Sequence, residues 1–216
     1  IIRTWAFYTI VKAHLHENSI PWKNLMISGW CLASDKTKMS KSKGNVVTPV
    51  DLIVDKGADV VRYWASTSRL GSDTAFSEDL LKIGRKLVNK LWNATSFAGI
   101  HLGKIDGKPT TAVEDVASGG INETLDKWIL TRLHKTIVKA TDEFENFEYC
   151  DARVAIEEFF WKDFCDWYIE LVKPRLASDD VQTQKLALFT AMGVLEGSLR
   201  LLAPFPGRAS IAARVA

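Results

Sequence analysis

The chain has 216 residues, of which 47% are hydrophobic, 25% charged and 10% aromatic, with a formal net charge of +2. This apolar content is enough for a folded core, so it excludes intrinsic disorder and collagen-like repeats, and three cysteines are too few for a disulfide scaffold. Residues 1–109 contain 16 basic and 9 acidic side chains, whereas residues 110–216 contain 12 and 17. We therefore expect a polyanionic partner at the basic half.

Several other classes of site are not predicted. Cys31, Cys150 and Cys165 form no C-x-x-C pair, and each is expected to pack as a small apolar side chain. No residues have metal-ligand spacing, so we predict no metal site. The absence of a long apolar run and of a secretory signal favours a reduced, cytoplasmic protein. Because the chain starts inside a helical pattern at Ile1, we expect it to be a fragment.

The first half of the chain predicts short elements around a polar loop. Residues 1–16 have the apolar spacing of a helix. Residues 25–32 form a nearly continuous apolar run, whose length favours a buried strand of a parallel sheet. A lysine-rich polar stretch follows at residues 34–47, with Gly44 and Asn45 as a turn signal.

Three helices are predicted after this loop. Residues 48–51 combine a Thr N-cap, a Pro at the first helical position and an acid in the first turn, and Gly57 ends that helix. Asp59 is expected to cap the next helix, over residues 60–66. Ser77 caps a long amphipathic helix, whose apolar face contains Leu80, Ile83, Leu87, Leu91 and Ala94.

The second half predicts a helical bundle. Glycines and a proline interrupt the pattern at residues 101–121, which we interpret as a junction between domains. Beyond it, Asn122 and Ser178 act as N-caps in the pattern of three long helices, which cover residues 122–144, 151–173 and 178–202. The second helix is expected to end before Pro174 and to line the bundle core with Phe160, Phe164, Tyr168 and Leu171.

Aromatic side chains in this half have two readings. They could be platforms on which RNA bases stack. Their helical spacing and apolar neighbours instead favour the bundle core, and residues 122–170 carry 12 acidic against 6 basic side chains, which disfavours broad contact with a phosphate backbone. The residues concerned are Trp128, Trp161, Trp167 and Tyr168.

Residues 38–45, with the sequence KMSKSKGN, carry the clearest chemical signal. With residue 36, the loop presents four lysines, together with two serine hydroxyls. At the carboxyl end of a parallel strand, such a loop lies where nucleotides bind. Its ammonium groups could neutralise charge as pyrophosphate leaves a triphosphate. A solvated surface loop is the alternative, but the flanking strand and capped helix favour phosphate binding.

The same stretch resembles the lysine-methionine-serine-lysine-serine signature of class I aminoacyl-tRNA synthetases. The order and spacing of further motifs resemble the valyl-tRNA synthetase family, at residues 38–47, 57–66, 70–73, 90–93, 126–130 and 160–171. The resemblance covers about residues 1–206. It implies a mostly α fold, in which the C-terminal end of a class I Rossmann-type nucleotide-binding domain precedes an α-helical anticodon-binding bundle.

The resemblance also implies a reaction, namely ATP-dependent activation of valine and transfer of the valyl group to tRNA(Val), with ATP used as its Mg²⁺ complex. Lys38 and Lys41 would contact the ATP phosphates and act in catalysis, and Ser40 and Ser42 would support the loop and the bound ATP. The family's His-x-Gly-His element is absent and would precede the chain, so the chain alone is expected to be inactive. A non-catalytic tRNA-binding module, a synthetase-like relic, or an isoleucyl- or leucyl-specific relative remain alternatives.

The expected domains are residues 1–57 of the catalytic domain, a stem-contact and connecting segment at 58–121, the anticodon-binding domain at 122–206, and an atypical tail at 207–216. Contacts with tRNA are expected from a basic set near the second of these domains, which comprises Arg62, Arg69, Lys82, Arg85, Lys86 and Lys90. On the bundle, a basic stripe could also bind tRNA, although a solvated helix face is equally expected for its members Arg132, Lys135 and Lys139. We expect a monomer.

Overall fold

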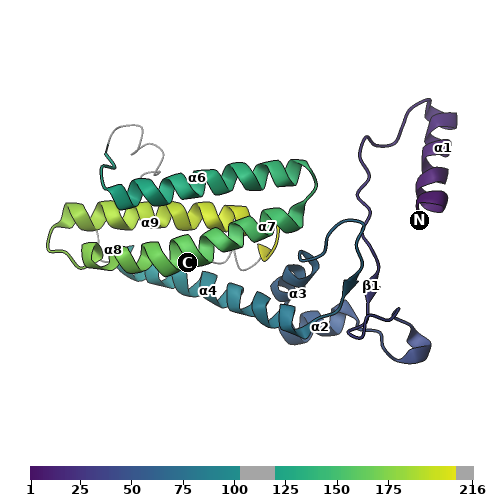
Figure 1. The fold of residues 1–216 in the computed structure, drawn as a ribbon, viewed down its shortest axis with the longest axis horizontal. Helices are drawn as coiled ribbons and strands as arrows, with labels where there is room; N and C mark the ends of the chain where they lie inside the picture. Colours follow the sequence, from purple (N-terminus) through teal and green to yellow (C-terminus); the bar gives the residue numbers. More distant parts are fainter. Residues whose placement is uncertain (103–119, 208–216) are drawn as a thin grey trace.

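The computed structural model describes residues 1–102 and 120–207. Within these ranges the chain is mostly helical and contains one two-stranded sheet. Figure 1 shows an elongated bundle formed by α4, α6, α7, α8 and α9, with α2, α3 and β1 beyond one end and α1 farthest away. Most of the predicted domain junction at 101–121, and all but one residue of the tail at 207–216, lie outside the described residues.

The predicted N-terminal helix is confirmed. It starts with a π-type turn at Ile2–Ala6 and continues as α1 (Phe7–Glu17), which ends at Asn18 in the left-handed conformation. None of the residues of α1 is buried. Trp5 stacks on Trp22 of the following segment, with ring centroids 5.5 Å apart. This part of the chain therefore folds locally and shares little core with the rest of the described residues.

The predicted strand is parallel, as expected, but it is shorter and less buried. β1 is Cys31–Leu32, and it pairs in parallel with β2 (Thr74–Ala75). Trp30 is 65% exposed and Cys31 is also exposed. The predictions of a buried strand and of a packed Cys31 are therefore wrong, because the side chains of a strand project from the faces of the sheet and pairing with β2 along one edge does not cover those faces.

Two short helices follow the lysine loop. α2 (Pro49–Lys56) has Thr48 as its N-cap residue and ends at Gly57, as predicted, although the Thr48 hydroxyl donates to a carboxylate in the first turn instead of capping a backbone N–H. α3 (Ala58–Ala65) then starts at once, with Gly57 as its N-cap. The predicted cap at Asp59 is therefore wrong. This acid lies in the first turn of α3, where its negative charge interacts favourably with the positive end of the helix dipole.

The long amphipathic helix is confirmed as α4 (Glu78–Leu102), and the Ser77 hydroxyl accepts a hydrogen bond from the Leu80 backbone N–H at 3.4 Å. Ile83 is 42% exposed, so its place on the apolar face was predicted wrongly. Gly84 is buried instead, which lets the helix approach the ring of Tyr63 closely. The buried stripe is shifted by one residue at this point, and it contains Leu81, Leu87, Leu91 and Ala98.

The three bundle helices are confirmed with shifted ends. The first is α6 (Thr124–Glu145), with Glu123 rather than Asn122 at its N-cap. The third is α9 (Val181–Leu202), capped by Asp180, whose carboxylate accepts the backbone N–H groups of the first turn at 3.1–3.2 Å. This bidentate cap replaces the predicted one at Ser178, because a carboxylate can satisfy two of the free N–H groups at once.

The middle helix is continuous but changes its winding. It consists of α7 (Tyr149–Glu158), a π-type stretch at Phe159–Tyr168, and α8 (Ile169–Leu176), which contains Pro174. The prediction that it ends before Pro174 is wrong, because Val172 and Leu176, on either side of the proline, are buried in the core and hold the last turn of the helix in place.

The π-type winding also decides which residues of this helix face the core. Phe160, Phe164 and Tyr168 are buried, as predicted, but the next member of the row is Val172, which is fully buried, whereas Leu171 is 51% exposed. In an α-helix residues four apart are out of line by about 40°, and the wider π turns, which rotate the chain less per residue, offset this drift. The row therefore continues at intervals of four residues.

The aromatic side chains of the bundle divide into two groups. Tyr168 is fully buried and Trp161 is half-buried, in agreement with the core prediction. Trp167 is 60% exposed and Trp128 is 36% exposed, so they were placed in the core wrongly. Cys150 and Cys165 are buried as predicted. No helix in the described ranges is both long and apolar enough to cross a membrane.

Candidate phosphate-binding loop and RNA surface

The lysine loop starts directly after β1 with a tight turn. Leu32 forms an antiparallel bridge with Lys38, and the Ala33 backbone N–H donates to the Thr37 carbonyl at 2.9 Å. Ala33 is buried and Lys36 adopts the left-handed conformation with φ 63°. The chain therefore reverses at residues 33–37 and presents Lys38 at the end of the sheet.

A second reversal closes the other side of the loop. Lys41–Lys43 form one 3₁₀ turn, and the Gly44 backbone N–H donates to the Lys41 carbonyl at 3.2 Å. Gly44 has φ 67°, a conformation that a residue with a Cβ adopts only with strain. The predicted turn signal at Gly44 is confirmed, and it directs the next residue back toward the start of the loop.

Asn45 occupies the middle of this loop, although the sequence pattern marked it only as part of a turn. Its side-chain oxygen accepts the Ser40 backbone N–H at 2.8 Å, and its amide nitrogen donates to the Thr37 hydroxyl at 3.1 Å and to the Lys38 carbonyl at 3.3 Å. The tendency of Asn to bond nearby backbone groups could have suggested this role. Asn45 joins the two arms of the loop.

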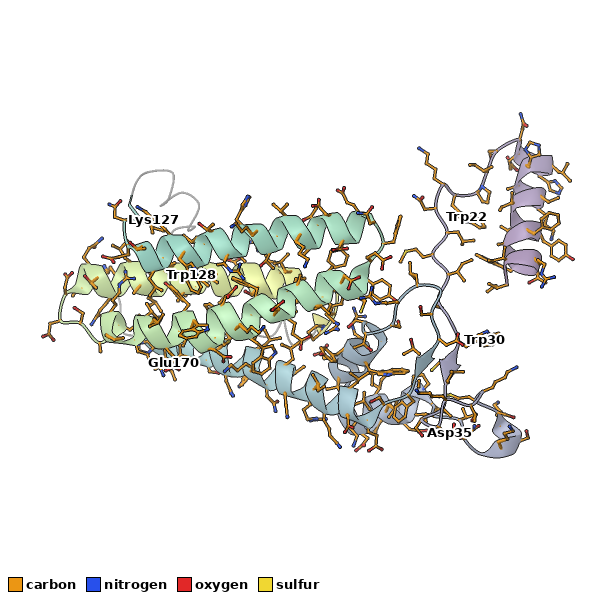
Figure 2. The ribbon with its side chains drawn as sticks, viewed as in Figure 1. Trp22, Trp30, Asp35, Lys127, Trp128 and Glu170 are labelled. Atoms are coloured by element: carbon orange, nitrogen blue, oxygen red, sulfur yellow. The ribbon has the colours of Figure 1, made fainter. Side chains whose placement is uncertain are left out.

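Of the predicted ATP-contacting residues, Lys38, Lys41 and Ser42 are exposed on the rim of this loop, and Ser40 is half-buried. The Lys41 ammonium makes no hydrogen bond or ion pair with any described residue, whereas the Lys38 Nζ lies 5.3 Å from the centroid of the Trp30 ring. Ser40 and Ser42 bond to each other through their hydroxyls at 2.7 Å. Figure 2 labels Trp30 at this end of the molecule, far from Trp128 of the bundle.

The acidic side chain of the loop, Asp35, is hydrogen-bonded to Thr37. The Thr37 hydroxyl and backbone N–H both donate to Asp35, at 2.7 and 3.0 Å, and these bonds, with a smaller contribution from Lys43, lower the pKa of the Asp35 carboxyl. Asp35 is thus occupied by Thr37 and does not form an ion pair with Lys38 or Lys41. The arrangement leaves cationic side chains available to an anion such as a phosphate group.

The basic set near α3 and α4 is largely engaged within the protein. Arg62 donates from Nε to the Phe205 carbonyl at 2.7 Å and from Nη2 to the Pro204 carbonyl, which ties α3 to the end of α9. Arg85 donates to the backbone carbonyl of Lys56 at 2.6 Å. These two guanidinium groups therefore have structural partners as well as exposed surface.

The remaining members of this basic set also differ in whether their charged groups have partners within the protein. Arg69 makes a bidentate pair with Asp151, and Lys82 pairs with an acid of its own helix at 2.9 Å. The Lys90 Nζ lies 5.4 Å from the centroid of the Trp161 ring. Lys86 is exposed, and the structure gives it no hydrogen bond or ion pair within the described ranges. Lys86 is therefore the member most available to an RNA phosphate.

The basic stripe on the bundle is also divided. Arg132 donates to Asp163 at 2.7 Å, and their side chains are 47% and 15% exposed. Lys135 and Lys139 are exposed and border a shallow hollow of about 440 Å³ on α6, which His134 and two acids also line. Lys139 also lies near Asp151 and Glu158 and helps to lower the pKa of both carboxyls, so Lys135 is the more independent cation of the stripe.

Two buried ionic clusters hold the helices that carry these cations. The Tyr63 hydroxyl donates to Glu157 at 3.0 Å and accepts from Arg153 at 3.1 Å, which joins α3 to α7. At the other end of the bundle, Asp126 accepts hydrogen bonds from Tyr168 and Arg175, both at 2.8 Å. Burial, reinforced by the neighbouring carboxylates, raises the pKa of both tyrosines. These clusters fix the relative positions of the helices.

We find no metal-binding arrangement in the described part of the chain, since no three or more His, Cys, Asp or Glu side chains within residues 1–102 and 120–207 converge to hold an ion. The lysine loop itself offers ammonium and hydroxyl groups, which suit phosphate oxygens.

Comparisons with protein families match both parts of the chain. Residues 1–77 match the model described as tRNA synthetases class I (I, L, M and V), and residues 126–206 match the anticodon-binding domain of tRNA ligase. The first match contains the lysine loop with both strands of the sheet, and the second contains all of the bundle helices except α4.

Among curated relatives, the chain is 54% identical to the valine–tRNA ligase of Wolbachia sp. subsp. Brugia malayi over 207 residues, which cover 95% of the chain and 23% of the relative. It is 55% identical to that of Wolbachia pipientis wMel, with the same coverage, and 50% identical to that of Rickettsia rickettsii, of which it covers 26%. The chain therefore spans about a quarter of the length of the relatives that it matches.

Solved structures share its fold. One is the LeuRS of Agrobacterium radiobacter K84, in a ternary complex with tRNA and LeuAMS. The match covers 97% of the present chain and 25% of the LeuRS chain, with a TM-score of 0.69 at 21% identity. Another is the methionyl-tRNA synthetase of Mycobacterium tuberculosis, in complex with methionyl-adenylate. The match covers 85% of the present chain and 36% of the synthetase chain, with a TM-score of 0.66 at 20% identity. Family matches, relatives and fold agree, and the chain belongs to the class I tRNA synthetases, with valine–tRNA ligases as its relatives.

Proposed function

We propose that the chain is a segment of a valine–tRNA ligase that presents the lysine loop to ATP and contributes contacts to tRNA(Val). The observation that carries the proposal is the loop itself. Two reversals at the end of a parallel strand leave the Lys41 ammonium without a partner among the described residues, in a segment that is 50–55% identical to valine–tRNA ligases.

In the proposed reaction, the valine carboxylate attacks the α-phosphate of ATP and pyrophosphate leaves. Lys41 and Lys38 stabilise the negative charge that develops on the leaving phosphates, because ammonium groups placed there interact more strongly with the transition state than with bound ATP. The hydroxyls of Ser40 and Ser42 donate to phosphate oxygens or keep the loop in shape. ATP enters as its Mg²⁺ complex, so the ion is part of the substrate.

For tRNA binding we propose two surfaces that follow from the availability of the cations. Lys86, with Arg85, Lys90 and Arg62 around it, contacts the tRNA backbone beside α4. On the bundle, Lys135 makes the corresponding contact, and Arg132 does so only if it leaves Asp163. Each such contact is sequence-independent and sensitive to salt.

We further propose the division into residues 1–57, 58–121, 122–206 and 207–216, and a monomeric cytoplasmic enzyme. Because the chain spans about a quarter of its relatives, we propose that it does not activate valine by itself. Valine-dependent exchange of pyrophosphate into ATP by the isolated chain would contradict this last point.

The central proposal is tested in a chimaera, in which this chain replaces the matching segment of the Wolbachia pipientis wMel enzyme. Lys41→Ala should lower the kcat of valine-dependent ATP–pyrophosphate exchange by about 100-fold or more, with little change in the KM for valine, since its charge acts mainly in the transition state. Lys23→Ala removes the same charge from an exposed position outside the loop and serves as the control. Equal activity of the two variants would refute the proposal.

A further inference from the structure

We propose that Asn45 is a positioning residue of the reaction, whose carboxamide holds the backbone around Lys38 and Ser40 so that the Lys41 ammonium is directed at the ATP phosphates. This inference rests on the proposed function of the loop. Asn45 itself is not expected to touch the substrate, since its polar atoms are already bonded within the loop.

The geometry explains why one side chain can organise the whole loop. The Asn45 oxygen accepts the Ser40 N–H at 2.8 Å, and its nitrogen donates to the Lys38 carbonyl at 3.3 Å. These two backbone groups flank Met39, so the carboxamide holds the two peptides on either side of Met39, just before the Ser40–Lys41 peptide. A third bond, to the Thr37 hydroxyl at 3.1 Å, joins the same carboxamide to the turn held by Asp35.

Only a carboxamide can make this set of bonds. The side chain must accept from one backbone group and donate to two other oxygens, and Asn offers an acceptor oxygen and two N–H donors. An aspartate of the same shape keeps the acceptor, but it loses both donated bonds and faces the Lys38 carbonyl with a negative charge. Asn45 is half-buried, whereas the lysines and Ser42 of the rim are exposed. Water therefore competes less for the hydrogen bonds of the Asn45 carboxamide than for the polar groups of the rim.

The position of Lys41 depends on these backbone contacts because its side chain has no other support. Its ammonium has no partner among the described residues, and Lys41 starts the 3₁₀ turn that Gly44 closes. The Lys43 backbone N–H donates to the Ser40 carbonyl at 3.1 Å, so the residue whose N–H is held by Asn45 also provides the carbonyl that closes the start of that turn. A shift of the Ser40 peptide would therefore move the whole turn.

A double-mutant cycle in the chimaera separates positioning from general loop stability. Asn45→Ala should lower the kcat of valine-dependent ATP–pyrophosphate exchange by about 10-fold, with an unchanged KM for valine, because the loop loses the bonds of the carboxamide and only part of that loss misplaces Lys41. Asn45→Asp should lower it by about 100-fold, since it adds a negative charge beside the phosphates. Asn24→Ala, at an exposed position, is the control.

If Asn45 acts through Lys41, the effects of the two substitutions are not additive. In the Lys41→Ala background, Asn45→Ala should cost less than about 2-fold. A full 10-fold loss in that background, or exchange at the unsubstituted rate in Asn45→Ala alone, would overturn the inference. Unsubstituted activity in Lys41→Ala would instead refute the proposed function, so the two failures are distinct.

The structural part of the inference is tested in the 216-residue chain itself. Hydrogen exchange of the Ser40 amide should become at least about 10-fold faster in Asn45→Ala and stay unchanged in Asn24→Ala, because only the first substitution removes its acceptor. Equal exchange rates of the Ser40 amide in Asn45→Ala and in the unsubstituted chain would overturn the inference, whatever the kinetics.

Discussion

The Lys38 ammonium lies over the indole ring of Trp30, with its Nζ 5.3 Å from the ring centroid. Trp30 is 65% exposed and directly precedes β1, whereas Lys38 pairs with the other end of that strand through its bridge to Leu32. An exposed cation–π contact of this kind is worth about 0.5–1 kcal/mol. The ammonium therefore has a weak resting position, which it must leave in order to reach a phosphate group.

This contact leads to a prediction for ATP binding by the chimaera. Trp30→Leu should lower the KM for ATP by about 2- to 5-fold, because Lys38 no longer has to leave the ring before it binds a phosphate. Trp30→Tyr keeps an aromatic ring and should change the KM by less. The measurement is ATP–pyrophosphate exchange at varied ATP, and a raised KM in Trp30→Leu would contradict the prediction.

Lys135 and Arg132 lie one turn apart on α6 but should differ in their effect on tRNA binding. Lys135→Ala should weaken the binding of tRNA(Val) to the chimaera and reduce the slope of log K against log salt by about 1, since one phosphate contact is lost. Arg132→Ala should have a smaller effect, because Arg132 is paired with Asp163.

Filter binding across a series of salt concentrations measures these slopes. Lys12→Ala on the exposed surface of α1 is the control for the loss of one charge. Slopes that are unchanged in Lys135→Ala would remove α6 from the proposed tRNA surface.

Two glycines of α4 should respond in opposite ways to the same substitution. A Cβ at Gly84 would lie 2.7 Å from the nearest atom of the Tyr63 ring, whereas nothing lies within 4 Å of a Cβ at Gly99. Gly84→Ala should therefore lower the free energy of unfolding by about 1–3 kcal/mol through overpacking. Gly99→Ala should raise it by up to about 1 kcal/mol through higher helix propensity.

Urea denaturation of the 216-residue chain, followed by circular dichroism, measures both changes. Equal effects of the two substitutions would show that α3 does not pack against α4 at Gly84 as described.

The cysteines should differ in their reaction with thiol reagents. Burial raises the pKa of the Cys165 thiol to about 12, and the same effect raises that of the exposed Cys31 from its ordinary value. At pH 8 the folded chain should react much faster at Cys31 than at Cys165, because the thiolate is the reactive form and Cys165 has the more strongly raised pKa and is also buried.

The raised pKa also fixes the sign of a pH dependence. Folding favours the protonated Cys165 thiol, so the unfolded chain loses this proton at a lower pH than the folded chain does. The contribution of this group to the free energy of unfolding is therefore present below about pH 9 and decreases as the pH rises toward 12.

The reactivity of each cysteine is measured by labelling with iodoacetamide and mass spectrometry, at pH 8 and at higher pH.

The sequence by itself determined the parts of this protein that depend on local interactions. Residues 48–51 predicted the start of α2, Ser77 predicted the start of α4, and Gly44 predicted a reversal, because a cap, a proline or a glycine acts within a few residues. The lysine signature likewise identified the loop and the family, since both depend on residues that are adjacent in the chain.

Only the tertiary structure decided what depends on partners far apart in the sequence. The exposure of Trp167 and Leu171 follows from the π-type winding of one helix against its neighbours, and Cys31 is exposed because pairing with β2 along an edge does not cover the face from which its side chain projects. The pairs of Arg62 with residues 204–205 and of Arg132 with residue 163 withdraw these cations from solvent. Spacing shows which side chains share a helix face, but burial and pairing depend on the element that covers that face.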